Sequence, residues 1–148
     1  MTNSSIHSIA DSITRKYGMG ECQNCANALA NELNRSGIKG KILKIQALGA
    51  RPYIVMEDVN FKLPWAGSAE YSITHNSFHY GVLVGNTVYD NIHRAGISQE
   101  KWLKSFTCDG GRFKLEIIRE FNRWGLTILQ GLPRRSRRLF SILGIFFQ

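Results

Sequence analysis

Apolar residues recur at helical spacing near the start of the chain, before any strand pattern begins. In residues 4–17 they fall at Ile6, Ile9, Ala10, Ile13 and Tyr17. Asn3 or Ser4 is a candidate N-cap for that segment. Residues 22–36 place small and apolar side chains on one face and polar ones elsewhere, and Gly37 supplies a natural helix end. The pattern therefore predicts two consecutive amphipathic helices.

The middle of the chain alternates between apolar and polar residues in the manner of β-strands. KILKIQAL (41–48) and YIVME (53–57) predict two strands. FHYGVLVGNTVYDNI (78–92) predicts a hairpin that turns at Gly85-Asn86. RFKLEIIREF (112–121) predicts a further strand, or a strand that passes into a helix.

The order of these elements predicts the fold class. Two helices precede several consecutive strands, without the βαβ alternation of a parallel sheet, so the chain is expected to be α+β, with the N-terminal helices packed on an antiparallel sheet. Residues 58–76 are expected to form a loop. Ser98 is expected to cap a short helix that runs through Trp102 and Phe106, two residues expected to be core.

Charge divides the chain into a body and a tail. The 148 residues carry a formal charge of +8 and are 43% hydrophobic, which fits one globular domain. Residues 1–121 form the expected domain, and residues 122–148 form a tail with five arginines and no acid. Because most of the excess charge lies in the tail, nucleic acid is a less favoured partner.

The tail has its own pattern, in which RRSRR precedes the apolar run LFSILGIFF. Nine apolar residues are too few to span a bilayer. The segment is expected either to close over the sheet or to contact a membrane surface or a partner. The start of the chain lacks the pattern of a secretory signal, so a cytoplasmic location is expected, with secretion by a route that needs no cleavable signal left open.

Two of the three cysteines, Cys22 and Cys25, lie at the start of the second predicted helix. They could be core residues, half of a zinc site, or a redox pair, but no second paired spacing completes a metal site and no βαβ unit surrounds them. Cys22 lies in the first helical turn, where unpaired N–H groups and the helix dipole favour a thiolate. The neighbouring Glu21 opposes that shift.

The predicted hairpin brings a histidine and a carboxylate together. If Val84 pairs with Thr87, Gly81 lies opposite Asp90, and His79 shares their face of the sheet. Asp90 is then a diagonal neighbour of His79 and can orient its imidazole, as in a nucleophilic triad. Asn91 is expected to face away. His93 lies just past the strand and is a candidate accessory residue.

A helix-start cysteine followed by a hairpin carrying His and then Asp is the order found in papain-like and transglutaminase-like thiol enzymes. ECQNCANALANELNRSGIKGKI, the FHYGVLVGNTVYDNIHRAGIS block and Trp102 resemble the papain-fold toxins of bacterial polymorphic toxin systems, over residues 18–121. The resemblance implies a papain-like (transglutaminase-like) core with Cys22, His79 and Asp90 as catalytic residues and no metal or other cofactor. A papain-style comparison would select Cys25 as the nucleophile instead. The resemblance to papain-fold toxins also implies action in a bacterial cytoplasm and a cognate immunity protein.

One feature departs from the papain pattern. No glutamine precedes the nucleophile to act as an oxyanion donor. The backbone N–H of Cys22 can supply one donor, and either Asn24 or the N–H of a nearby loop residue is a candidate for the second.

Three functions remain open from the sequence. The favoured one is a toxin-like thiol enzyme that acts on protein or amide substrates as a peptidase, deamidase or acyl transferase. The second is an RNA-targeting, nuclease-type toxin with a basic surface, and the third is a binding module without enzymatic activity.

Overall fold

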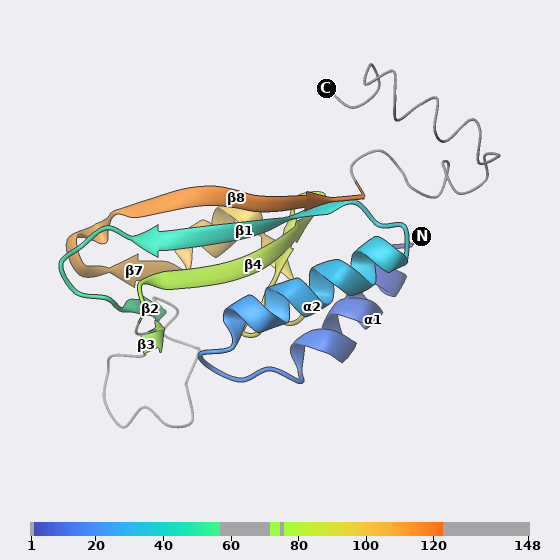
Figure 1. The fold of residues 1–148 in the computed structure, drawn as a ribbon, viewed down its shortest axis with the longest axis horizontal. Helices are drawn as coiled ribbons and strands as arrows, with labels where there is room; N and C mark the ends of the chain where they lie inside the picture. The colour runs from blue at the N-terminus through green and yellow to red at the C-terminus, as the bar shows by residue number, and fades with distance from the viewer. Residues whose placement is uncertain (1, 57–71, 75, 123–148) are drawn as a thin grey trace, which may run out of the picture.

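The computed structural model describes residues 2–56, 72–74 and 76–122 (Figure 1). Two helices, α1 (Asn3–Thr14) and α2 (Cys22–Arg35), precede the strands, as the apolar spacing predicts. Thr2, rather than Asn3 or Ser4, is the N-cap residue of α1, and its side chain makes no capping bond. The predicted end of α2 is confirmed, because Gly37 takes a positive φ of 76° and its N–H donates to Asn34 O.

The larger sheet has five strands in the order β6-β5-β4-β1-β8. These are β1 (Gly40–Ala47), β4 (Phe78–Val84), β5 (Thr87–Tyr89), β6 (Ile97–Ser98) and β8 (Phe113–Phe121). Every neighbouring pair is antiparallel, and β1 lies between β4 and β8. The α+β class with an antiparallel sheet is therefore confirmed.

A second, smaller sheet has the order β3-β2-β7. Its strands are β2 (Ile54–Met56), β3 (Ser72–Thr74) and β7 (Phe106–Cys108). The predicted loop over residues 58–76 is wrong at 72–74, and Phe106 begins a strand rather than continuing a helix. Strands of three residues are too short to show an alternation, and their pairing joins segments far apart in the sequence.

Helix α3 (Gln99–Lys104) is capped as predicted, because Ser98 Oγ accepts a hydrogen bond from the Lys101 N–H at 3.3 Å. The 3₁₀ turn η1 (Asp109–Gly111) links β7 to β8. None of the helices in the described ranges is long and apolar enough to cross a membrane. Glu57 and the elements expected within residues 125–148 lie outside the described residues.

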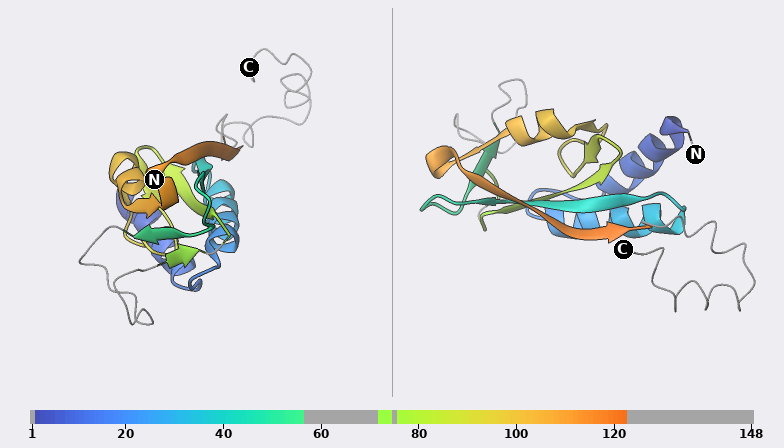
Figure 2. Two further views of the ribbon diagram at one scale, coloured as in Figure 1. Left: turned by 90° about the vertical axis from the view of Figure 1, so that its left-hand side faces the viewer. Right: turned by 90° about the horizontal axis from the view of Figure 1, so that it is seen from above.

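Apolar side chains on the two faces of the five-stranded sheet form two cores. Ile42 belongs to the core that includes Leu29 and Leu33 of α2, whereas Leu43 and Ile45 belong to the core built around Trp102. The views in Figure 2 show α1 and α2 on one side of the sheet and α3 on the other. This layering places the start of α2 near the start of β4, where the candidate site lies.

Candidate active site

Cys22 is the first residue of α2, after a tight connection from α1. Gly20 has a positive φ of 81°, and Glu21 Oε2 accepts a hydrogen bond from the Gly18 N–H at 2.7 Å, so this turn has a fixed shape. The first N–H groups of a helix have no acceptor within the helix, which favours a negative charge at this end. Cys22 is 6% exposed.

The predicted hairpin register is confirmed. Val84 pairs with Thr87 and Val82 with Tyr89, which places Asp90 beside the strand that carries His79. His79 Nε2 lies 2.9 Å from Asp90 Oδ2, and both side chains are buried.

Gly81, on the strand that carries His79, leaves room for the side chains of Val88 and Trp102. A Cβ built at residue 81 would lie 2.7 Å from Val88 Cγ1 and 2.9 Å from Trp102 Cζ2. Both neighbours are buried in the core and have no space to withdraw. The absence of a side chain at this position therefore lets the Trp102 indole pack directly on β4.

The Asp90 carboxylate accepts hydrogen bonds on both oxygens. Besides His79, Oδ2 accepts from Trp102 Nε1 at 2.7 Å, and Oδ1 accepts from the backbone N–H groups of Ile92 and His93. His93 Nδ1 lies 3.2 Å from each oxygen. Burial raises the pKa of Asp90, but the bonds and charges of the two histidines outweigh it and hold the pKa well below its usual value. Asp90 is thus ionised.

An ionised Asp90 fixes the tautomer of His79. Nε2 must carry the proton that it donates to the carboxylate, so Nδ1 is the nitrogen left to exchange a proton with another group. Nδ1 is buried and has no nitrogen or oxygen partner within the described residues. The ring centroid lies 5.0 Å from that of Phe106 and 6.0 Å from that of Trp102, which holds the plane of the imidazole. Burial lowers the pKa of His79, but Asp90 and Cys22 raise it to about 9.

The interaction between His79 and Cys22 also changes the pKa of the Cys22 thiol. Burial raises the pKa of Cys22, whereas the hydrogen bond and charge of His79 and the backbone N–H groups of Tyr80 and Gln23 lower it by more, so the net shift is downward. The site therefore favours a thiolate on Cys22 beside an imidazolium on His79.

Cys25 lies one helical turn further on and differs sharply from Cys22. It is 1% exposed, and burial together with the charge of Asp90 raises its pKa to about 12. Its thiol therefore stays protonated and inert at neutral pH. The two cysteines have opposite electrostatic environments on one helix face.

The three accessory residues predicted from the sequence, Asn91, His93 and Asn24, lie in different positions relative to the site. Asn91 Nδ2 donates a hydrogen bond to Gly18 O at 2.8 Å, which ties the end of the hairpin to the turn before α2. His93 joins the site through Asp90 and packs edge-on against Phe106. Asn24 is an exposed residue in the first turn of α2. Within the described residues, no group of three or more His, Cys, Asp or Glu side chains could hold a metal ion.

Sequence reasoning missed one member of the site. Trp102 was expected to be core, and it is fully buried, but its indole N–H also donates to Asp90. A buried indole usually finds an acceptor, so the residue type gave a signal. The identity of the acceptor depends on how α3 packs against the hairpin, which no local pattern encodes.

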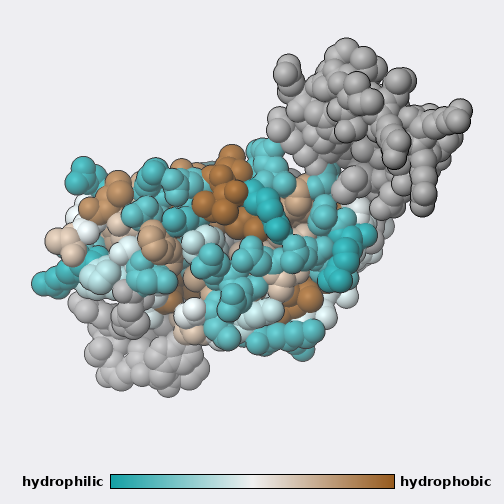
Figure 3. All heavy atoms as spheres, in the orientation of Figure 1, coloured by the Kyte–Doolittle hydropathy of each residue, from teal (hydrophilic) through white to brown (hydrophobic). Residues whose placement is uncertain are grey.

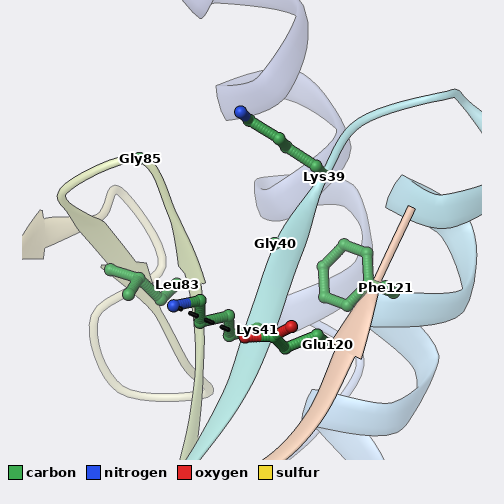
Figure 4. Close-up of a pocket in the computed structure, with 7 residues that line it drawn as sticks. All are labelled: Lys39, Gly40, Lys41, Leu83, Gly85, Glu120 and Phe121. Carbon is green, nitrogen blue, oxygen red and sulfur yellow. Dashed lines mark ion pairs between the residues drawn. The ribbon is translucent and has the colours of Figure 1, made fainter. Parts of the chain in front are cut away.

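A cavity of about 350 Å³ lies away from the site around Cys22, where β4 ends and β1 begins. His79 is near the start of β4, whereas the cavity is lined by residues at its end and by the neighbouring ends of β1 and β8 (Figure 4). These are Lys39, Gly40, Lys41, Leu83, Gly85, Glu120 and Phe121. The cavity is separate from the site around Cys22.

Comparison with known families gives one match. The model of a family described as papain fold toxin 2 matches residues 4–107, which is more than half of the chain and runs from α1 into β7. Cys22, His79 and Asp90 all lie within the matched range. No curated protein and no solved structure matches the chain.

Proposed function

Because the chain belongs to the papain fold toxin 2 family, we propose that it is a toxin that acts as a thiol enzyme on protein or amide substrates. In this proposal Cys22 is the nucleophile, His79 is the general base and acid, and Asp90 orients the imidazole. The contact between Asp90 and His79, together with the opposite pKa shifts of His79 and Cys22, supports this assignment above all.

The reaction begins with the Cys22 thiolate and the His79 imidazolium. The sulfur attacks a carboxamide carbon, the C–S bond forms, and the carbonyl π electrons move to the oxygen. The N–H groups in the first turn of α2, including that of Cys22, are the donors for this oxyanion. When the C–N bond breaks, His79 gives its proton to the departing ammonia or amine, and a thioester remains on Cys22.

The thioester is resolved by a second nucleophile. Neutral His79 removes a proton from water or from an acceptor amine, which attacks the thioester carbon and releases the Cys22 thiolate. Asp90 keeps Nε2 protonated throughout, so that Nδ1 performs both transfers. Peptidase, deamidase and acyl transferase chemistry share these steps and differ only in the leaving group and the acceptor.

The proposal includes a biological setting. The enzyme acts on a protein substrate in the cytoplasm of a target bacterium, and a cognate immunity protein protects the producer. Nucleic acid is a less favoured partner, since the body of the chain is near neutral. The basic and apolar tail, residues 122–148, is proposed to meet a membrane surface or a partner.

Labelling with iodoacetamide between pH 4 and 9, mapped by mass spectrometry, tests the activated thiol. We expect Cys22 to be alkylated selectively below the usual pKa of a thiol, and the selectivity to be lost in His79→Ala. Equal, slow labelling of all three cysteines in the native protein would overturn the assignment.

Growth of bacteria that express the protein in the cytoplasm tests the toxin function. Cys22→Ala is expected to abolish growth inhibition, while Cys25→Ala at the neighbouring position on the same helix face serves as the matched control and is expected to retain it. Inhibition that survives Cys22→Ala would refute a thiol mechanism.

A further inference from the structure

Strand β8 forms one edge of the five-stranded sheet. It pairs along its length with β1, and within the described ranges no strand pairs with its outer side. Its nine residues make it the longest strand of the described structure. An outer edge presents backbone N–H and C=O groups to any strand that can align with it.

Three apolar residues in the middle of β8 are exposed, which is unusual for the edge strand of a sheet. Leu115 is 42% exposed, Ile117 is 54% exposed and Ile118 is 49% exposed. Figure 3 shows hydrophobic side chains gathered along the side of the molecule where Figure 1 draws β8. Native edges are usually protected by charge, so this row of apolar residues indicates a contact surface.

The pairing with β1 shows which face of the sheet these residues occupy. Leu115 pairs with Ile45 and Ile117 with Leu43, two residues of the core around Trp102. The apolar row on this face therefore continues from the core to the open edge. The register shifts after Ile117, where Ile118 is the extra residue of a bulge, so the regular part of the edge is Phe113–Ile117.

The opposite face of the same five residues carries alternating charge. Lys114 and Glu116 lie on it, 2.7 Å apart from Nζ to Oε1, and both side chains retain exposed surface. An antiparallel pairing of two such strands centred on Leu115 places Lys114 of each copy opposite Glu116 of the other. On the apolar face, it places Phe113 opposite Ile117 and Leu115 opposite Leu115. The segment is thus complementary to itself in both charge and hydrophobicity.

We propose that β8 is an interface through which two copies of this chain associate. The two β8 strands align antiparallel about a two-fold axis, so that the two five-stranded sheets become continuous. A second copy is the occupant because it supplies the complementary order of charges by symmetry. Since β1 lies between β8 and β4, His79 stays outside the interface, and the proposed site of each copy remains open.

Charge variants of the full chain give a sharp test by analytical ultracentrifugation. In Lys114→Glu and in Glu116→Lys each symmetric pair becomes repulsive, so each homodimer is expected to weaken by about tenfold or more in Kd. An equimolar mixture of the two variants restores two attractive pairs and is expected to form a heterodimer. The double variant, Lys114→Glu with Glu116→Lys, is expected to dimerise like the native chain.

Ile117→Lys tests the apolar face, with Leu103→Lys on α3 as the matched control, since Leu103 is also exposed and lies away from β8. We expect the first variant to be monomeric and the second to dimerise, both with native circular dichroism. A native chain that stays monomeric at 100 µM, roughly the upper range for a weak specific dimer, overturns the proposal. So does a dimer whose Kd is unchanged in both single charge variants, Lys114→Glu and Glu116→Lys.

Hydrogen exchange identifies any other occupant. In the native dimer, slow exchange at the β8 amides that point away from β1 is expected to become fast in Ile117→Lys, whereas the amides bonded to β1 stay slow in both. Slow exchange that persists in a native monomer would assign the edge to another segment of the same chain and would overturn the proposed interface.

Discussion

Asp90 Oδ2 accepts a hydrogen bond from His79 Nε2 at 2.9 Å, across the two strands of one hairpin. The carboxylate is fully buried, and a buried charge of this kind is stable only when each oxygen has partners. Here the backbone after β5, the Trp102 indole and two histidines supply them. These hydrogen bonds stabilise the ionised form of Asp90. The ionised carboxylate in turn keeps Nε2 of His79 protonated.

Asp90→Asn is expected to lower the pKa of His79 from about 9, because the amide cannot stabilise the imidazolium by charge. The thiolate of Cys22 then loses its counter-ion, and the rate of alkylation at pH 6 is expected to fall by roughly 10²-fold or more. An NMR titration of the His79 ring proton reports the first effect, and timed labelling reports the second. An unchanged His79 titration would show that Asp90 does not set the protonation of the imidazole.

Trp102→Phe is expected to destabilise the fold through its effect on Asp90. The variant keeps an aromatic ring but removes the indole N–H, so a buried carboxylate loses one donor, at a cost of about 1–3 kcal/mol. Urea unfolding measures the change. Leu103→Ala, on the exposed side of the same helix, is the control, and we expect it to stay within about 0.5 kcal/mol of the native chain. Equal effects of both changes would contradict a specific role for the indole.

The hairpin was predictable because its geometry is local. A two-residue turn at Gly85-Asn86 fixes the register, and the register together with the two-residue period of a strand decides that His79 and Asp90 share a face. The helix that carries Cys22 was predictable for the same reason, since its apolar spacing spans four turns. These local patterns place each proposed catalytic residue on its element.

The parts of the fold and of the site that the sequence does not predict depend on contacts between segments that are far apart in the chain. The small sheet joins β2 to β3 and β7 through strands of three residues, which leave no periodic signal. From the sequence, Cys22 is preferred over Cys25 by the family resemblance and by its position nearer the helix start. In the structure the difference depends on which thiol interacts with His79 and which is buried near Asp90. Such differences emerge only when the helix docks on the sheet.

Gly81→Ala tests the close packing between β4 and α3. The added methyl group would meet Val88 and Trp102 side chains that are fully buried, so overpacking is expected to cost about 1–3 kcal/mol and to disturb the indole that holds Asp90. Gly18→Ala is the matched control, because its Cβ would approach only Glu21 Oε2, at 3.6 Å. Thermal unfolding compares the two. A Gly81→Ala variant as stable as the control would show that this glycine is replaceable.

The ion pairs of the site predict how stability depends on pH. His79 has a raised pKa in the folded state, so its contribution is complete below the unfolded value of 6.5 and is lost as pH rises through about 9. Cys22 has a lowered pKa, so its contribution is present above the unfolded value of 9.0 and is lost as pH falls through its folded value. Between pH 6.5 and 9 the two slopes oppose each other in the native chain.

Cys22→Ser separates these two contributions. Without the thiol, the free energy of unfolding is expected to fall as pH rises above 6.5, with a slope of up to about 1.4 kcal/mol per pH unit for one proton. The double variant Cys22→Ser with Asp90→Asn lacks the ion pair that raises the pKa of His79 and is expected to show a flatter profile. Urea unfolding of both variants between pH 6 and 9.5 measures the slopes. Identical profiles would mean that Asp90 and His79 are not coupled electrostatically, which would remove the orienting carboxylate from the proposed mechanism.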